Sequence, residues 1–270
     1  MSDLLEVRYG ANLLVETLFE ALSSKGLVVK KRRKLATIML AARDLFGLQD
    51  HSIVKESYEI MNVDDRWVRQ QSTSKDPYRA REVYLASFTE DPDALMQWRL
   101  YGGQGAGVCI GMSFTGTEKL KREGTAPIKI HVNRVKYDRA HMKRNFQKQI
   151  EKIFISDELW PLANSLFFNA TLLKQSDYAH EREWRLFVWT NALDKSPEMT
   201  HDGRRIRPYL ILDFPKGGKE SLPIVSVRTG PCSSFDGRHD EDWRKYVETH
   251  LPELASSADV FYDSEKEIRS

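Results

Sequence analysis

The sequence predicts an α+β protein with a mixed or antiparallel sheet core, an N-terminal helical segment and a central helical insertion. Apolar residues recur at helical spacing up to Phe46, and again between residues 138 and 174. Short apolar runs typical of strands dominate most of the remaining sequence. Because helices and strands do not alternate regularly along the chain, α+β is favoured over a doubly wound α/β fold.

The composition is that of an ordinary soluble protein. The chain has 270 residues, of which 41% are hydrophobic, and a formal net charge of +2. This length can bury a sizeable core, and so small a net charge argues against a general nucleic-acid binder. We expect one domain over residues 1–270, mainly helical over 1–75 and with a sheet-containing core over 76–270, whose helices lie at about 138–175.

Cysteine usage and hydropathy predict a reduced, cytoplasmic setting with no membrane partner. Cys109 and Cys232 are far apart in the sequence and form no Cys-x-x-Cys pair. No apolar run approaches the roughly 20 residues that span a bilayer. The N-terminus shows no basic-then-apolar signal pattern.

Two amphipathic helices are expected first, over residues 3–23 and from the basic run Lys30–Lys34 to about Phe46. The basic run is either a phosphate-binding patch or the solvated start of a helix, and the small net charge favours the second. A third helix is expected over His51–Gln71.

The most specific stretch is Val83–Phe114, which predicts a strand, an acidic turn, a short helix, a glycine loop and a second strand, Val108–Met112. Trp98 and Tyr101 lie on the short helix, where they are either core residues or ligand contacts. The glycine cluster lacks the Gly-Lys-Ser/Thr of a phosphate loop, so a flexible turn is expected.

Further elements follow from local patterns. Pro161 is expected to break or kink the long helical region, because proline lacks the amide hydrogen that a helix interior needs. A helical turn is predicted over Glu118–Glu123 and a polar loop over Asn191–Arg205. Other predicted elements are strands at 128–137, 181–189, 208–214, 223–228 and 260–262, and a helix at 240–250.

Two segments are candidates for a site. Strand alternation places Ser87 and Thr89 on one face, and Glu181 and Glu183 on one face if their strand already runs there. Two carboxylates on one face repel each other, which can raise the pKa of one and suit acid–base work. Alternatively, the hydroxyl residues end a strand, and the glutamates form ion pairs with Arg182, Arg185 or Arg99.

These segments resemble a known family, the bacterial domain of unknown function 2971 (DUF2971). The resemblance also includes a weaker opening, Glu6 with Arg8-Tyr9-Gly10. Its main motifs are Ser87-Phe88-Thr89-Glu90, Asp93, Met96-Gln97-Trp98, Tyr101-Gly102, Gly107-Val108-Cys109-Ile110-Gly111 and Glu181-Arg182-Glu183-Trp184-Arg185. In that family two strands usually precede the opening motif. This chain either lacks them, has an internally assigned start, or receives them from another chain.

The motif order is in turn similar to ADP-ribosyltransferases of the Arg–Ser-x-Ser/Thr–Glu-x-Glu type. The resemblance implies that Glu183 is the catalytic glutamate, that Glu181 orients an acceptor, and that Ser87 and Thr89 support bound NAD. Trp98 or Tyr101 would then stack on nicotinamide. The first-strand arginine of that type has no match in this sequence.

Two functions are therefore open. One is an NAD-consuming enzyme with NAD as its substrate and a protein or nucleic-acid acceptor, in a toxin or phage-defence effector. The alternative is a non-catalytic binding module that acts through a protein or nucleic-acid partner, with Lys30–Lys34 and Arg204–Arg207 as its contacts. No metal is expected, because one histidine beside acids, His180-Glu181-x-Glu183, is common by chance.

Overall fold

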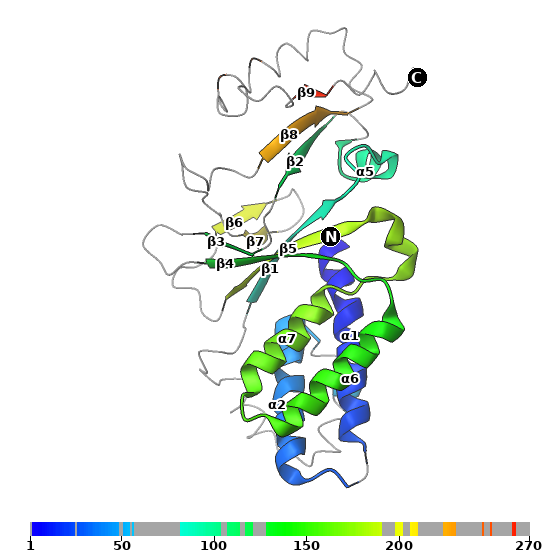
Figure 1. Ribbon diagram of the computed structural model, residues 1–270, viewed down its shortest axis with the longest axis vertical. Helices are drawn as coiled ribbons and strands as arrows, with labels where there is room; N and C mark the ends of the chain where they lie inside the picture. Colours follow the sequence, from blue (N-terminus) through cyan, green and yellow to red (C-terminus); the bar gives the residue numbers. More distant parts are fainter. Residues whose placement is uncertain are drawn as a thin grey trace. The chain divides into compact units, whose positions relative to one another are not determined.

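The protein is described by a computed structural model, and the expected α+β fold class is confirmed (Figure 1). The chain divides into two compact units, Met1–Phe88 with Ile130–Ile211 and Thr89–Lys129 with Leu212–Ser270. A single domain over 1–270 stays a prediction. The structure describes residues 2–24, 26–48, 51–54, 56, 82–103, 107–113, 117–120, 128–190, 198–201, 206–209, 224–230, 245, 249 and 261–262.

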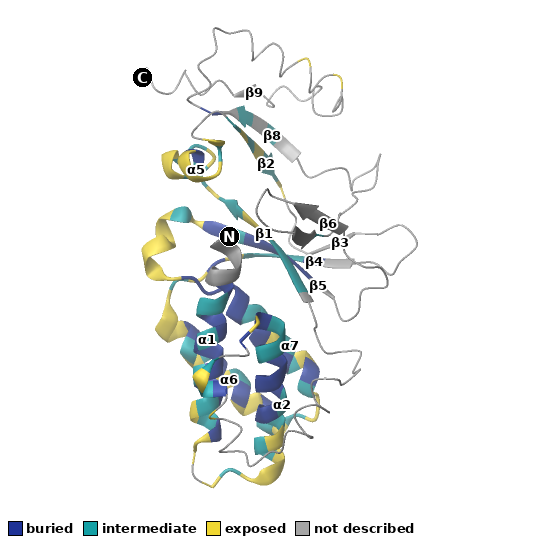
Figure 2. Ribbon diagram, turned by 180° about the vertical axis from the view of Figure 1, so that it is seen from behind, coloured by how far each residue is buried: buried dark blue, intermediate teal, exposed yellow. Residues whose placement is uncertain are grey.

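Four helices form the core of the first unit: α1 (Ser2–Leu22), α2 (Val29–Phe46), α6 (Arg139–Ile155) and α7 (Leu159–Thr171). α1 packs against the other three, and buried residues lie along all four helices (Figure 2). α1 and α2 confirm the first two predicted helices. The third falls largely outside the described residues, of which 52–54 and 56 are helical.

Helices α1 and α7 approach each other closely at Gly10. A Cβ atom built on Gly10 would lie 1.9 Å from the carbonyl oxygen of Ala170. No side chain fits at that distance, so the absence of a Cβ allows the two backbones to touch. This contact gives a physical reason for the glycine of the opening motif.

The basic run fastens the start of α2 to the end of α6. Lys34 Nζ donates to the carbonyl oxygens of Ile153 (3.3 Å) and Ser156 (2.5 Å), where a cation is favoured by the helix dipole. Lys31 lies over the Phe154 ring, and Lys30 is 3.6 Å from an Asp157 oxygen. Three of the run's cations therefore have partners within the protein.

The predicted break at Pro161 is wrong. α6 ends at Ile155 and α7 begins at Leu159, so Pro161 is the third residue of α7. Amide groups of the first turn have no intrahelical acceptor, and a proline there costs little. The polar segment between the helices makes the break instead.

Strands β1 (Glu82–Thr89), β5 (Glu183–Thr190) and β4 (Ile128–Arg134) lie in one sheet, in the order β1-β5-β4. β4 and β5 are antiparallel, with Val132 opposite Leu186. The first unit also contains an antiparallel pair, β6 (Glu198–His201) with β7 (Ile206–Tyr209). β6 falls within the predicted polar loop over 191–205, so that prediction is wrong for these four residues.

The second unit contains α5 (Leu95–Leu100) and a sheet in the order β2-β8-β9. β2 (Val108–Met112) is antiparallel to β8 (Ile224–Thr229), and β8 is parallel to β9 (Phe261–Tyr262). The predicted helical turn at Glu118–Glu123 is wrong, because β3 spans Thr117–Leu120. Strand pairing there overrides the local preference of a charged segment.

Most of the strand predicted at 208–214 and of the helix at 240–250 lies outside the described residues. Among the described helices, none combines the length and apolar character that a membrane crossing requires.

Candidate functional site

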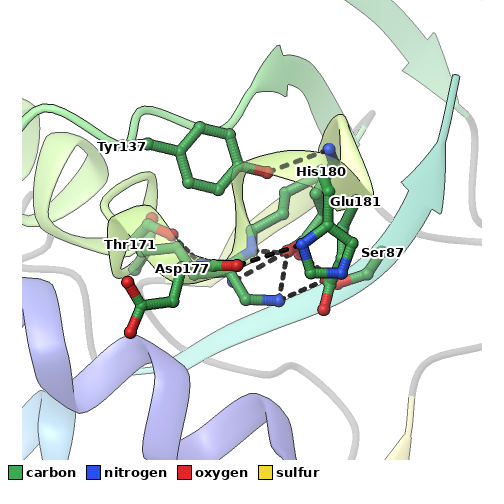
Figure 3. Close-up of polar contacts among 9 residues, drawn as sticks. Ser87, Tyr137, Thr171, Asp177, His180 and Glu181 are labelled. Atoms are coloured by element: carbon green, nitrogen blue, oxygen red, sulfur yellow. Dashed lines mark hydrogen bonds and ion pairs between the residues drawn. The ribbon is translucent and has the colours of Figure 1, made fainter. Parts of the chain in front are cut away.

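The two predicted segments meet through Ser87 and Glu183. Ser87 is exposed near the end of β1, and Glu183 is the first residue of β5, with only 4% of its surface exposed. The Ser87 hydroxyl donates to Glu183 Oε1 at 2.7 Å, a contact between residues 96 positions apart (Figure 3). Neighbouring strands in one sheet thus bring the hydroxyl motif and the glutamate motif together.

Two buried cations also hold the Glu183 carboxylate. Arg185 Nε donates to Oε1 at 2.6 Å, and Lys174 Nζ donates to Oε2 at 3.0 Å. Arg185 is fully buried, and its Nη1 donates to the Thr171 carbonyl oxygen at the end of α7. The carboxylate therefore anchors the sheet to the segment that follows the helical bundle.

Glu181 joins the same cluster by a different route from the expected one. It is the last residue of the 3-10 helix η2 (Ser176–Glu181), and Arg182 follows with a left-handed backbone (φ 46°), so β5 does not reach Glu181. Glu181 Oε2 instead accepts from Lys174 Nζ at 2.5 Å. Lys174 lies between the two glutamates and bonds to both.

The expectation that mutual repulsion raises a glutamate pKa is wrong for Glu183. Burial alone would raise the pKa of Glu183. The hydrogen bond and charge of Arg185, with smaller contributions from Ser87 and Lys174, outweigh burial and lower this pKa below its ordinary value of 4.5. Glu183 is therefore an ionised carboxylate at neutral pH.

The lowered pKa of Glu183 predicts how stability depends on pH. A carboxylate whose pKa is lower in the folded protein than in the unfolded chain stabilises the fold at pH values above its pKa in the unfolded chain. This stabilisation is lost as the pH falls through the pKa of the folded protein. Glu183→Gln should lower the free energy of unfolding by about 2 kcal/mol at neutral pH. This is less than the usual cost of removing one partner of a buried ion pair, because glutamine keeps one acceptor oxygen.

The free energy of unfolding in urea at pH 7 and at pH 3.5 checks this prediction. The difference between wild type and Glu183→Gln should shrink at the lower pH. Glu151→Gln, on the exposed side of α6, is the control and should leave stability within about 0.5 kcal/mol of wild type. A difference that stays constant between the two pH values would contradict the assignment.

Tyr137 contacts the cluster through the backbone of Glu183. The backbone N–H of Glu183 donates to the Tyr137 hydroxyl at 3.1 Å, just beyond the left-handed Arg182 (Figure 3). Burial raises the pKa of Tyr137, so this phenol stays neutral at physiological pH. Tyr137 thus positions the start of β5.

The other three predicted site residues lie in the second unit. Thr89 Oγ1 accepts from the Asp91 amide at 3.2 Å, in the turn that follows β1. Trp98 is 4% exposed, whereas Tyr101 is 64% exposed. The described contacts therefore bring Ser87, Glu181 and Glu183 together and do not include these three.

Trp98 is the centre of a separate cluster built from the motif residues of the second unit. Its Nε1 donates to Asp93 Oδ1 at 3.0 Å, and the other Asp93 oxygen lies 3.3 Å from Arg228 Nη1. A Cβ on Gly102 would lie 2.6 Å from the Trp98 ring, and the Gly107 amide donates to the Gly102 carbonyl oxygen. Gly102 therefore lies directly against the Trp98 ring, where a side chain would not fit.

Sequence reasoning named Arg185 as an ion-pair partner but missed Lys174 and Tyr137. Glu183 and Arg185 are two residues apart on one strand, so alternation places them on the same face. No motif marks Lys174 or Tyr137.

In the part of the chain that the structure describes, no three His, Cys, Asp or Glu side chains are grouped to hold a metal ion.

The fold and the buried ion cluster define an α+β protein, and no curated protein and no solved structure matches the chain. Residues 97–186 match the family model described as "Protein of unknown function (DUF2971)". The resemblance predicted from the motifs is thereby confirmed over this segment, which includes Trp98, Lys174 and Glu183.

Proposed function

We propose that the protein is an NAD-consuming enzyme of the ADP-ribosyltransferase type, with Glu183 as its catalytic carboxylate. The observation that supports this most directly is the 2.7 Å hydrogen bond between Ser87 and Glu183. It joins the hydroxyl and Glu-x-Glu motifs, whose order along the chain suggested the activity. Such an activity fits a toxin or a phage-defence effector.

The chemistry requires a negative charge next to the reacting sugar. As the bond between C1′ of the ribose and nicotinamide breaks, its electron pair leaves with nicotinamide and the sugar becomes an oxocarbenium ion. A fixed carboxylate lowers the energy of that cation, and Glu183 is ionised at neutral pH. A nucleophile of the acceptor then bonds to C1′ and loses its proton, and Glu181 would orient that acceptor; with water the result is hydrolysis.

The alternative of a non-catalytic binding module is less well supported. Lys30, Lys31 and Lys34 of its first proposed contact have partners within the helical bundle. Of its second contact, Arg204 and Arg205 lie outside the described residues.

Nicotinamide release from NAD tests the proposal, in buffer and with added cell lysate. Glu183→Gln should lower the rate at least about 100-fold, the usual effect of removing a group that stabilises transition-state charge. Glu151→Gln should release nicotinamide as fast as wild type. Equal rates for wild type and Glu183→Gln, with both folded by circular dichroism, would refute the role of Glu183.

A further inference from the structure

The proposed role of Glu183 requires access to a sugar, yet this carboxylate is almost fully buried. Next to it in the chain lies η2, in which no residue is buried. The exposed helix is framed by Lys174, 2% exposed, and Glu183, 4% exposed. A surface segment is thus fixed at both ends to the same buried ion pair.

The described contacts between η2 and the buried cluster of Lys174, Glu183 and Arg185 are made through Lys174. Lys174 Nζ pairs with Glu181 at the end of η2 and lies 4.8 Å from the centre of the Tyr178 ring. Three further bonds stay within the segment after Lys174: the Tyr178 amide donates to the Gln175 carbonyl oxygen, His180 Nδ1 to that of Asp177, and the Arg182 amide to that of Ala179. Figure 3 shows Asp177, His180 and Glu181 around the cluster with Ser87. These internal bonds would move with the helix.

The junction between η2 and β5 carries backbone strain. Arg182 has a φ of 46°, and among the described residues it is the one non-glycine with a positive φ. L-residues avoid this region because the Cβ atom crowds the following carbonyl. A change of φ at Arg182 would relieve the strain and swing η2, while the Tyr137 hydroxyl continues to hold the Glu183 amide.

We propose that η2 is a cap over the Lys174–Glu183 pair, held closed by the Tyr178 ring and Glu181, and that its opening exposes the Glu183 carboxylate to substrate. Such a cap would regulate access to the site of the proposed function, and the identity of the substrate rests on that function. Cap opening is a property of the folded chain that is measured without NAD.

Carboxyl labelling measures the opening directly. The protein is treated with a carbodiimide and glycine ethyl ester, and labelling rates at single glutamates are read by mass spectrometry. Tyr178→Ala removes the ring from Lys174 and should speed labelling of Glu183 about fivefold, as expected from the loss of one cation–π contact. Tyr178→Phe keeps the ring and should label at the wild-type rate. Exposed Asp157 is the internal reference and should label equally in all three proteins.

Three results would overturn the cap. Equal Glu183 labelling in wild type and Tyr178→Ala means that the ring does not hold η2 closed. Faster labelling in Tyr178→Phe as well means that the ring contact is not responsible. Faster hydrogen exchange in α1 and α7 of Tyr178→Ala means that the whole unit is destabilised.

Nicotinamide release is measured on the same variants. Fast labelling without release in any variant keeps the cap and refutes the enzyme, and release that does not rise with labelling refutes gating by the cap.

Discussion

Lys174→Met is expected to destabilise the protein by about 3–5 kcal/mol at neutral pH, the usual cost of removing one partner of a buried ion pair. Lys174 is 2% exposed, and its ammonium bonds to Glu181 and Glu183. Methionine keeps the length of the side chain but has no charge. The two carboxylates, otherwise bridged by Lys174, would then repel each other, and Arg185 would be the cation that remains beside Glu183 in the described cluster, with the Ser87 hydroxyl.

Urea unfolding of a double-mutant cycle separates this charge effect from lost packing. Glu181→Gln removes one of the two negative charges, so Lys174→Met/Glu181→Gln should be less destabilised than the sum of the single variants. Lys148→Met, on the exposed side of α6, is the matched control and should change stability by less than about 0.5 kcal/mol. Additive single effects would mean that Lys174 does not couple the glutamates.

Local periodicity predicted the helical bundle well, because burial of one helix face sets both the pattern and the fold. Helices α1 and α2 lie close to where the spacing of apolar residues placed them. Pro161 misled the prediction because the cost of a proline depends on its position in a helix, and the sequence does not give the register of the first turn. β6 was missed because pairing with β7, rather than its own sequence, makes it a strand.

The candidate site was predictable in part. Ser87 and Glu183 were expected together from the order of the motifs, and Arg185 was one of three arginines expected as ion-pair partners of the glutamates. Lys174 could not be found in this way, because its position depends on contacts between distant segments. Leu173 bridges to Lys136 after β4, and the Lys174 amide donates to the Lys136 carbonyl oxygen at 3.0 Å. This pairing brings the end of α7 beside the start of β5.

Gly10→Ala is expected to destabilise the first unit by about 3 kcal/mol, at the upper end of the usual range for overpacking. Helix propensity alone predicts the opposite sign, since alanine in a helix interior is about 1 kcal/mol more favourable than glycine. The added Cβ would lie 1.9 Å from the Ala170 carbonyl oxygen and 3.1 Å from the Leu173 Cβ. A carbonyl in the backbone of α7 cannot rotate away as a side chain can, so α1 and α7 must move apart.

The sign of the change in the free energy of urea unfolding decides between the two effects. Gln147→Ala, on the exposed side of α6, is the control for propensity and should stay within about 0.5 kcal/mol of wild type. Because α7 ends at Thr171, three residues before Lys174, separation of the helices should also reach the ion cluster, and Gly10→Ala should speed carboxyl labelling of Glu183. A Gly10→Ala protein as stable as wild type would show that α1 and α7 do not touch at this residue.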